Sequence, residues 1–233
     1  LWCGFGSCWI GAIFPCVGVV VAVSGFHQGA QSIVQTFCED PEHNAAIVWA
    51  ALIHTLNQTR GVTQILTMPY AESMRAFTRW HSQLWAESVG KDGRGTTPIR
   101  AVGPVDQHSQ LQLYLDGPDD KFYTIITIPS YGKGPRIDAN EAKRYGLDYM
   151  ANRTIGDMVT CQSRATQDSL RKQGRLVREI IATKGDEENL GSLFDSFMLE
   201  TIITAHLMGV KARLLYTSPS PRDRTPSPMP STA

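Results

Sequence analysis

Two side chains four residues apart could do chemistry together. Gln83 and Glu87 fall in a segment with the apolar spacing of a helix, where residues four apart share one face. Glu87 stands just before Gly90, in the last turn, where the negative end of the helix dipole disfavours a carboxylate. That position suits a general base, which takes up a proton. An exposed glutamate at a helix end is the plainer interpretation, and spacing does not choose between them.

His108 is a second candidate. It follows Pro104-Val105-Asp106, so if a helix begins here, Asp106 is its N-cap and His108 lies in its first turn. A helix N-terminus disfavours the imidazolium ion, so a neutral ring could exchange protons with an oxygen of a ligand. A polar loop histidine or a buried structural one is the alternative, and both stay open on the pattern.

The elements that must position these residues alternate between helix and strand. Such alternation favours an α/β fold with a mainly parallel sheet. We expect helices over 27–60 (broken at Asp40-Pro41 and stopped by Gly61), from Glu72 to Gly90, over 153–173 and over 189–207, and strands over 62–68, 99–102, 122–128 and 177–181.

Residues 106–117 are ambiguous. Leu111, Leu113 and Leu115 alternate with polar residues, which is the period of a strand. Asp116-Gly117-Pro118 then resembles a turn, so the local pattern predicts a hairpin with the strand at 122–128.

Composition excludes several classes of partner. Lys+Arg and Asp+Glu number 22 each in 233 residues, and we find no basic patch, so neither nucleic acid nor an anionic membrane is an expected partner. The five cysteines form no C-x-x-C pair, which argues against a metal site or a disulfide framework. Free thiols indicate a reducing compartment, and we expect a cytoplasmic protein.

Both ends of the chain are unusual. Residues 9–26 are apolar and uncharged, but Pro15 and the lack of Lys or Arg before Arg60 favour a buried segment over a membrane helix. The first residue is Leu1, which indicates that the native start lies upstream. Residues 217–233 contain five prolines and few aliphatic side chains, so we expect them to be disordered.

We therefore expect one folded unit over 1–212 and a tail over 213–233. The tail segment LLYTSPSPRD (Leu214–Asp223) resembles a translated DNA-library adapter, which predicts a non-native tail. A genuine linker rich in Pro, Ser and Arg is the alternative.

Four blocks carry a resemblance to a known family. In the order of the argument they are QLWAESVGKDGRG (Gln83–Gly95), GPVDQHSQLQLYLDGPDDKF (Gly103–Phe122), TMPYAESMRAF (Thr67–Phe77) and NLGSLFDSFMLETI (Asn189–Ile202). Together they resemble the C-terminal sugar-isomerase (SIS) domain of bacterial glucose-6-phosphate isomerases. The resemblance implies a three-layer SIS-type domain, truncated at both ends, with helix rather than hairpin over 106–117.

The resemblance also implies roles. Glu87 would move the proton between C2 and C1 of the sugar phosphate through a cis-enediol, His108 would assist ring opening, and Gln83 would contact the substrate. It implies no metal or other cofactor, a place in glycolysis and gluconeogenesis, and a homodimer in which His108 reaches the neighbouring subunit's site. A non-catalytic sugar-phosphate-binding module on the same fold is the alternative.

Three departures from the family bear on activity. The segment Cys3-Gly4-Phe5-Gly6-Ser7 lacks the arginine that the family places near the reacting carbons. The family's phosphate loop would lie upstream, and its lysine-bearing segment would follow Val210. We therefore expect little or no turnover from this chain alone.

Overall fold

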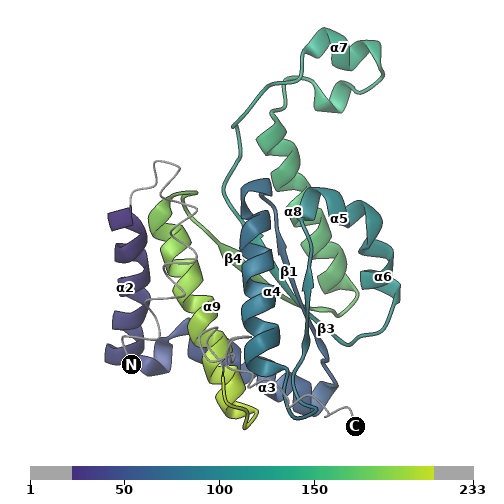
Figure 1. The fold of residues 1–233 in the computed structure, drawn as a ribbon. Helices are drawn as coiled ribbons and strands as arrows, with labels where there is room; N and C mark the ends of the chain where they lie inside the picture. Colours follow the sequence, from purple (N-terminus) through teal and green to yellow (C-terminus); the bar gives the residue numbers. More distant parts are fainter. Residues whose placement is uncertain (1–22, 213–233) are drawn as a thin grey trace, which may run out of the picture.

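The structure is a computed structural model that describes residues 23–212 (Figure 1). Within that range the chain forms a four-stranded parallel sheet in the order β2-β1-β3-β4. The strands are β1 (Gln64–Pro69), β2 (Thr97–Arg100), β3 (Lys121–Thr127) and β4 (Leu176–Ile181). Each lies within two residues of a predicted strand, so the expected α/β fold with a parallel sheet is confirmed.

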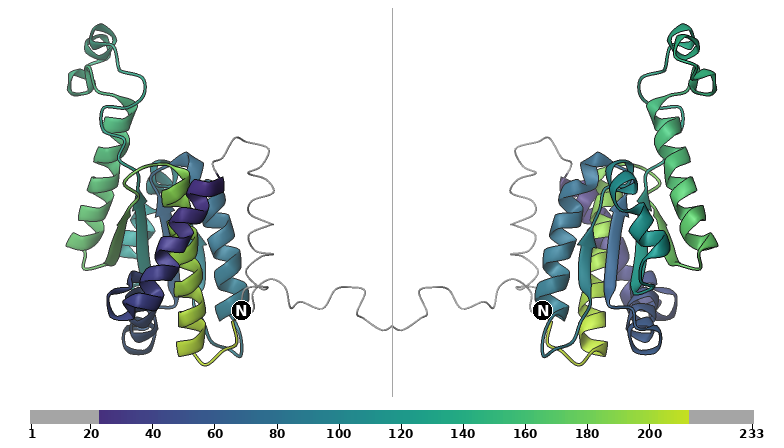
Figure 2. Two further views of the ribbon diagram at one scale, coloured as in Figure 1. Left: turned by 90° about the vertical axis from the view of Figure 1, so that its left-hand side faces the viewer. Right: turned by 90° about the vertical axis from the view of Figure 1, so that its right-hand side faces the viewer.

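Helices cover both faces of this sheet. One layer holds α2 (Val23–Glu39), α3 (Ala45–Arg60), α4 (Arg75–Val89) and α9 (Glu187–Leu207), with the short turns η1 (Pro41–His43) and η2 (Glu72–Met74). The other layer holds α5 (Gly103–Ser109), α6 (Leu111–Asp116) and α8 (Ile155–Lys172). Figures 1 and 2 show the sheet between these layers, with α2 packed on the outer side of α9, so the three-layer arrangement is confirmed.

Local sequence explains where the first helices begin and end. Pro41 starts η1 directly after α2, as the Asp40-Pro41 break predicted. The Asn44 side chain then accepts a hydrogen bond from the backbone N–H of Ala46 and caps α3. Gly61 ends α3 in the left-handed conformation (φ 65°), which costs glycine little.

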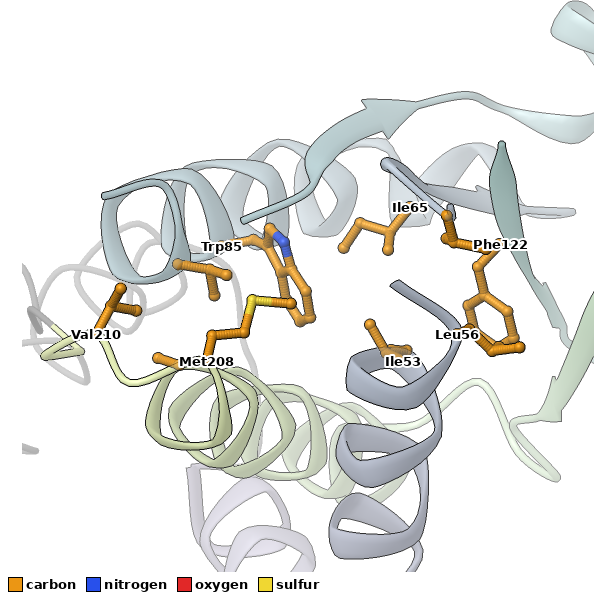
Figure 3. Close-up of a cluster of buried hydrophobic side chains, with 10 residues drawn as sticks. Ile53, Leu56, Ile65, Trp85, Phe122, Met208 and Val210 are labelled. Carbon is orange, nitrogen blue, oxygen red and sulfur yellow. The ribbon is translucent and has the colours of Figure 1, made fainter. Parts of the chain in front are cut away.

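The sheet divides the core into clusters on its two faces. Successive side chains of a strand point to opposite faces, and Ile65 and Phe122 accordingly pack with α3, α4 and the end of α9. Figure 3 shows this cluster, in which the buried ring of Trp85 lies between α4 and Met208. Leu66 and Tyr123 point the other way and pack with α6 and α8.

The predicted hairpin over 106–117 is wrong, and the helix that the family resemblance implied is confirmed. Leu111 and Leu115 pack against the core cluster on the α6–α8 face, as residues four apart on a helix can. Leu113 points outward and is 54% exposed. The alternation of leucines therefore arises on a short helix with two inward positions.

Residues 128–154 form an arm between β3 and α8. It contains α7 (Ala139–Arg144) and η3 (Asp148–Met150) and stands away from the three layers (Figures 1 and 2). Tyr131, Tyr145 and Tyr149 on this arm are 71%, 68% and 75% exposed. The sequence predicts no helix or strand between residues 128 and 153.

A capping box fixes the base of the arm. The Thr154 hydroxyl accepts from the backbone N–H of Asp157 (3.1 Å), and the Asp157 carboxylate accepts from the backbone N–H of Thr154 (2.8 Å). The same carboxylate accepts from the backbone N–H of Gly132 (2.8 Å). These backbone donors, Thr154 first, lower the pKa of Asp157, because they favour its charged form.

Several expectations concern residues outside the described range. These residues are the segment Cys3–Ser7, most of the apolar run 9–26, and the tail 213–233. Within residues 23–212, no helix combines the length and apolar character needed to cross a membrane.

Candidate active site

Gln83 and Glu87 share the exposed face of α4, as predicted. The Gln83 side-chain N–H donates to Glu87 Oε1 at 3.0 Å, and both side chains are exposed. The opposite face of α4 is buried and includes Phe77, His81 and Leu84. Burial first, and the charge of Arg178 second, lower the pKa of His81 to about 3, so this ring is a neutral part of the core.

The loop after Glu87 has an unusual backbone. Asp92 (φ 53°), Gly93 (φ 71°) and Gly95 (φ 104°) all have positive φ, which few side chains adopt. At Gly95 a Cβ atom would lie 2.7 Å from the Val89 carbonyl oxygen, so this position requires glycine. The Gly-rich composition of the loop therefore follows from its tight path.

Two basic side chains of this loop bind carbonyls at the end of α9 and just after it. Lys91 Nζ donates to the Lys211 carbonyl at 2.5 Å, and Arg94 Nη1 donates to the Met208 carbonyl at 2.6 Å. These contacts join positions more than a hundred residues apart in sequence. They fix the loop that follows Glu87 against the last turn of α9.

A hollow of about 550 Å³ with both polar and apolar lining lies between α3, this loop and α9. Its lining residues are His54, Asn57, Gln58, Thr63, Gly93, Arg94, Gly95, Leu207 and Met208. Neither Gln83 nor Glu87 lines it. The predicted site residues therefore lie on an open helix face, outside this hollow.

The predicted N-cap at Asp106 is wrong. Helix α5 begins at Gly103 after Val102, and its Pro104 fits the first turn. His108 therefore lies in the last turn, where the argument from a helix N-terminus does not apply. The Asp106 carboxylate instead accepts from the Val102 backbone N–H at 2.6 Å, reaching back to the start of the helix.

His108 is exposed, but its neighbour Gln107 is buried. Gln107 Nε2 lies 3.3 Å from His108 Nε2, and Gln107 Oε1 accepts from the Tyr70 hydroxyl at 2.9 Å and from Thr166 Oγ1 at 3.3 Å. Sequence reasoning missed Gln107, Tyr70 and Thr166. The adjacency of Gln107 to His108 was the one available signal.

The structure does not bring His108 to Glu87 within one chain. Helix α4 runs from the C-terminal ends of the parallel strands back to their N-terminal ends (Figure 1). Glu87 is in its last turn, ten residues before the start of β2 in the sequence. Helix α5, with His108, instead follows the C-terminal end of β2. Within residues 23–212, no group of three or more His, Cys, Asp or Glu side chains is placed to hold a metal ion.

Curated proteins match most of this chain. The probable glucose-6-phosphate isomerase of Methanococcus maripaludis is 36% identical over 202 residues, which is 86% of this chain and 44% of that protein. The glucose-6-phosphate isomerase of Rubrobacter xylanophilus is 34% identical over 198 residues, or 85% of this chain and 46% of that protein. The chain is related to the glucose-6-phosphate isomerases. It spans a little under half the length of these two relatives.

Solved structures agree on the fold. A hypothetical protein of Thermus thermophilus, TT0462, superposes with a TM-score of 0.73 at 25% identity, covering 82% of this chain and 46% of that one. The glucose-6-phosphate isomerase of Chlamydia trachomatis gives 0.62 at 17% identity, covering 81% and 39%, and shows the fold alone. No family model matches the chain.

Proposed function

We propose that this chain is part of a glucose-6-phosphate isomerase that interconverts glucose 6-phosphate and fructose 6-phosphate. In this proposal residues 1–212 belong to its SIS domain and residues 213–233 lie outside it. The observation that carries the proposal is the Gln83–Glu87 pair on the open face of α4, within a stretch related to curated isomerases.

The geometry of the pair suits proton transfer. The Gln83 amide donates to Oε1 of Glu87 and leaves Oε2 for a substrate. After the sugar ring opens, Glu87 would take the proton from C2, giving a cis-enediol(ate), and return it to C1 while the proton on O2 moves to O1. A positioned carboxylate of this kind commonly contributes about 10²–10⁴-fold to rate. No step of this proposed reaction requires a metal ion or other cofactor.

We further propose a homodimer in which His108 serves the site of the other subunit. His108 would there assist ring opening by donating a hydrogen bond to the ring oxygen. Glu87 and His108 lie on helices that lead to opposite ends of the parallel strands, and this separation supports the arrangement. The arm over 128–154 offers three exposed tyrosines, a residue type enriched in protein interfaces.

A full-length protein that carries this sequence tests the function. Glu87→Gln should lower kcat by at least about 10²-fold and keep binding of glucose 6-phosphate. Glu39→Gln is a matched control, because Gln35 donates to Glu39 Oε1 at 3.0 Å in the same four-residue geometry on α2. A coupled assay measures turnover. Substrate binding without turnover in the unaltered protein would favour the sugar-phosphate-binding module instead.

Mixing two inactive variants tests the shared site. Glu87→Gln and His108→Asn subunits, mixed after reversible dissociation, form heterodimers that contain one intact Glu87–His108 pair. Random pairing should then restore about a quarter of the unaltered activity. No recovery, in dimers shown to have exchanged, would place both residues of each site in one subunit.

We also place the protein in the cytoplasm and expect little turnover from the 233-residue chain alone. Cys38 and Cys161 are exposed free thiols, which fit a reducing compartment. Because the chain spans under half the length of its curated relatives, the activity is assigned to the longer protein.

A further inference from the structure

One ring nitrogen of His108 is already engaged within the fold. Its Nε2 lies 3.3 Å from Nε2 of Gln107, whose side chain is buried beneath α5. An amide nitrogen only donates hydrogen bonds. The imidazole Nε2 in this contact must therefore be the acceptor, which requires that it carry no proton.

Two hydroxyl groups contact the carbonyl oxygen of the Gln107 amide. The Tyr70 hydroxyl donates to Oε1 at 2.9 Å, and the Thr166 hydroxyl donates to the same oxygen at 3.3 Å. Burial raises the pKa of Tyr70 to about 12, which keeps its hydroxyl protonated and able to donate. With both donors on the carbonyl oxygen, the amide N–H groups face His108.

Three elements hold this arrangement in place. Tyr70 directly follows β1, and its backbone N–H donates to the Ile126 carbonyl of β3 at 2.8 Å. Thr166 lies on α8, and Gln107 on α5 (Figure 1). Gly103 lets α5 approach closely, because a Cβ atom there would lie 2.6 Å from the Tyr70 ring. The Gln107 amide therefore has a fixed position against the core.

We propose that Gln107 is a positioning residue that holds neutral His108 as the tautomer with its proton on Nδ1. Nε2 accepts from Gln107, so Nδ1–H is the group left to meet a substrate oxygen. Free neutral histidine favours the other tautomer, with the proton on Nε2. The consequence for catalysis depends on the proposed function, whereas the tautomer itself does not.

Nitrogen-detected NMR of the ¹⁵N-histidine-labelled 233-residue chain, above the pH at which imidazoles are charged, tests the tautomer. His108→Asn identifies the signals of His108. We expect Nε2 to resonate as an unprotonated ring nitrogen and Nδ1 as a protonated one. Protonated Nε2 in the unaltered chain would overturn the proposal, because the amide would then be turned with Oε1 toward the ring. This measurement needs no core variant to fold.

Gln107→Glu provides a second test with almost the same shape. It replaces the N–H donor by a carboxylate oxygen, so Nε2 of His108 should become protonated. His43 is the internal control, because its Nδ1 faces the Asp40 carboxylate at 2.8 Å on a distant surface and should not change. An unchanged His108 tautomer in the folded variant would contradict the role of Gln107.

The full-length protein links the tautomer to activity. Gln107→Glu should lower kcat by about 10²-fold with little change in KM. This loss in kcat is the lower end of what a positioned proton donor contributes to rate. Unchanged kcat, with the tautomer switched, would overturn the positioning role. Failure of the proposed function is distinguishable, because it would appear as absent turnover in the unaltered protein while the NMR result stands.

Discussion

Asp195 should make this fold more stable in mild acid than at neutral pH. It lies on α9 with 4% of its surface exposed, and its Oδ1 has no hydrogen-bond partner within residues 23–212. Burial raises the pKa of this carboxyl from its ordinary value of 3.8 to about 6, because it disfavours the charged form. Asp195→Asn removes the charge while keeping a similar shape.

The magnitude follows from the shift in pKa. Because the folded protein binds this proton more tightly than the unfolded chain, the stabilisation is full below the unfolded pKa of 3.8 and is lost as pH rises through about 6. A shift of about two pKa units corresponds to about 3 kcal/mol over the whole range, and to about 1.4 kcal/mol between about pH 5 and pH 7.5.

Urea unfolding of the 233-residue chain at several pH values tests this reasoning. The difference in unfolding free energy between Asp195→Asn and the unaltered chain should grow by about 1.4 kcal/mol from about pH 5 to pH 7.5. Subtracting one unfolding free energy from the other cancels the contributions of the titrating groups that both proteins share. Asp168→Asn, at an exposed position on α8, should show no such trend. A pH-independent difference for Asp195→Asn would refute the argument.

Two further substitutions probe the packing around α9. In the unaltered chain Arg178 binds the Glu200 carboxylate at 2.6 and 2.8 Å, so Arg178→Met leaves that buried carboxylate without its partner. The variant should lose about 3–5 kcal/mol of unfolding free energy in urea melts, and Arg178→Met/Glu200→Leu should recover much of this loss. An equal loss in the double variant would contradict the prediction. Gly191→Ala places a Cβ 2.0 Å from the Phe26 carbonyl oxygen and should destabilise by about 1–3 kcal/mol in the same measurement, whereas Gly25→Ala, with its nearest atom at 3.8 Å, should not.

The regular elements could be predicted because their signals are local. The apolar run before Pro69 is a central strand, and the Asp40-Pro41 break and Gly61 fall at helix ends. The alternating leucines after residue 110 led to the wrong prediction of a hairpin. In a helix of six residues an alternating pattern also places two leucines on one face. The family resemblance corrected this error.

The surroundings of His108 were beyond local sequence signals. Helix α5 begins three residues before the predicted N-cap, with Pro104 in its first turn, and Gly103 lies against the Tyr70 ring, a contact made across the fold. The buried amide of Gln107 likewise depends on Thr166, which lies 59 residues away in the sequence. The shared face of Gln83 and Glu87 needed only helical spacing, and that prediction is confirmed. Their roles in catalysis remain predictions.

The position of Glu87 depends on α9 as well as on its own helix. The loop after Glu87 is bound by Arg94 to the Met208 carbonyl at the end of α9, and by Lys91 to the Lys211 carbonyl just after it. The start of α9 is in turn set by its crossing with α2, where a Cβ at Gly29 would lie 1.8 Å from the Glu188 carbonyl oxygen. A change at this crossing can therefore move the far end of α9 and, with it, the loop beside Glu87. The block Asn189–Ile202, although distant in sequence, thus lies on the helix beside which the loop after Glu87 is held.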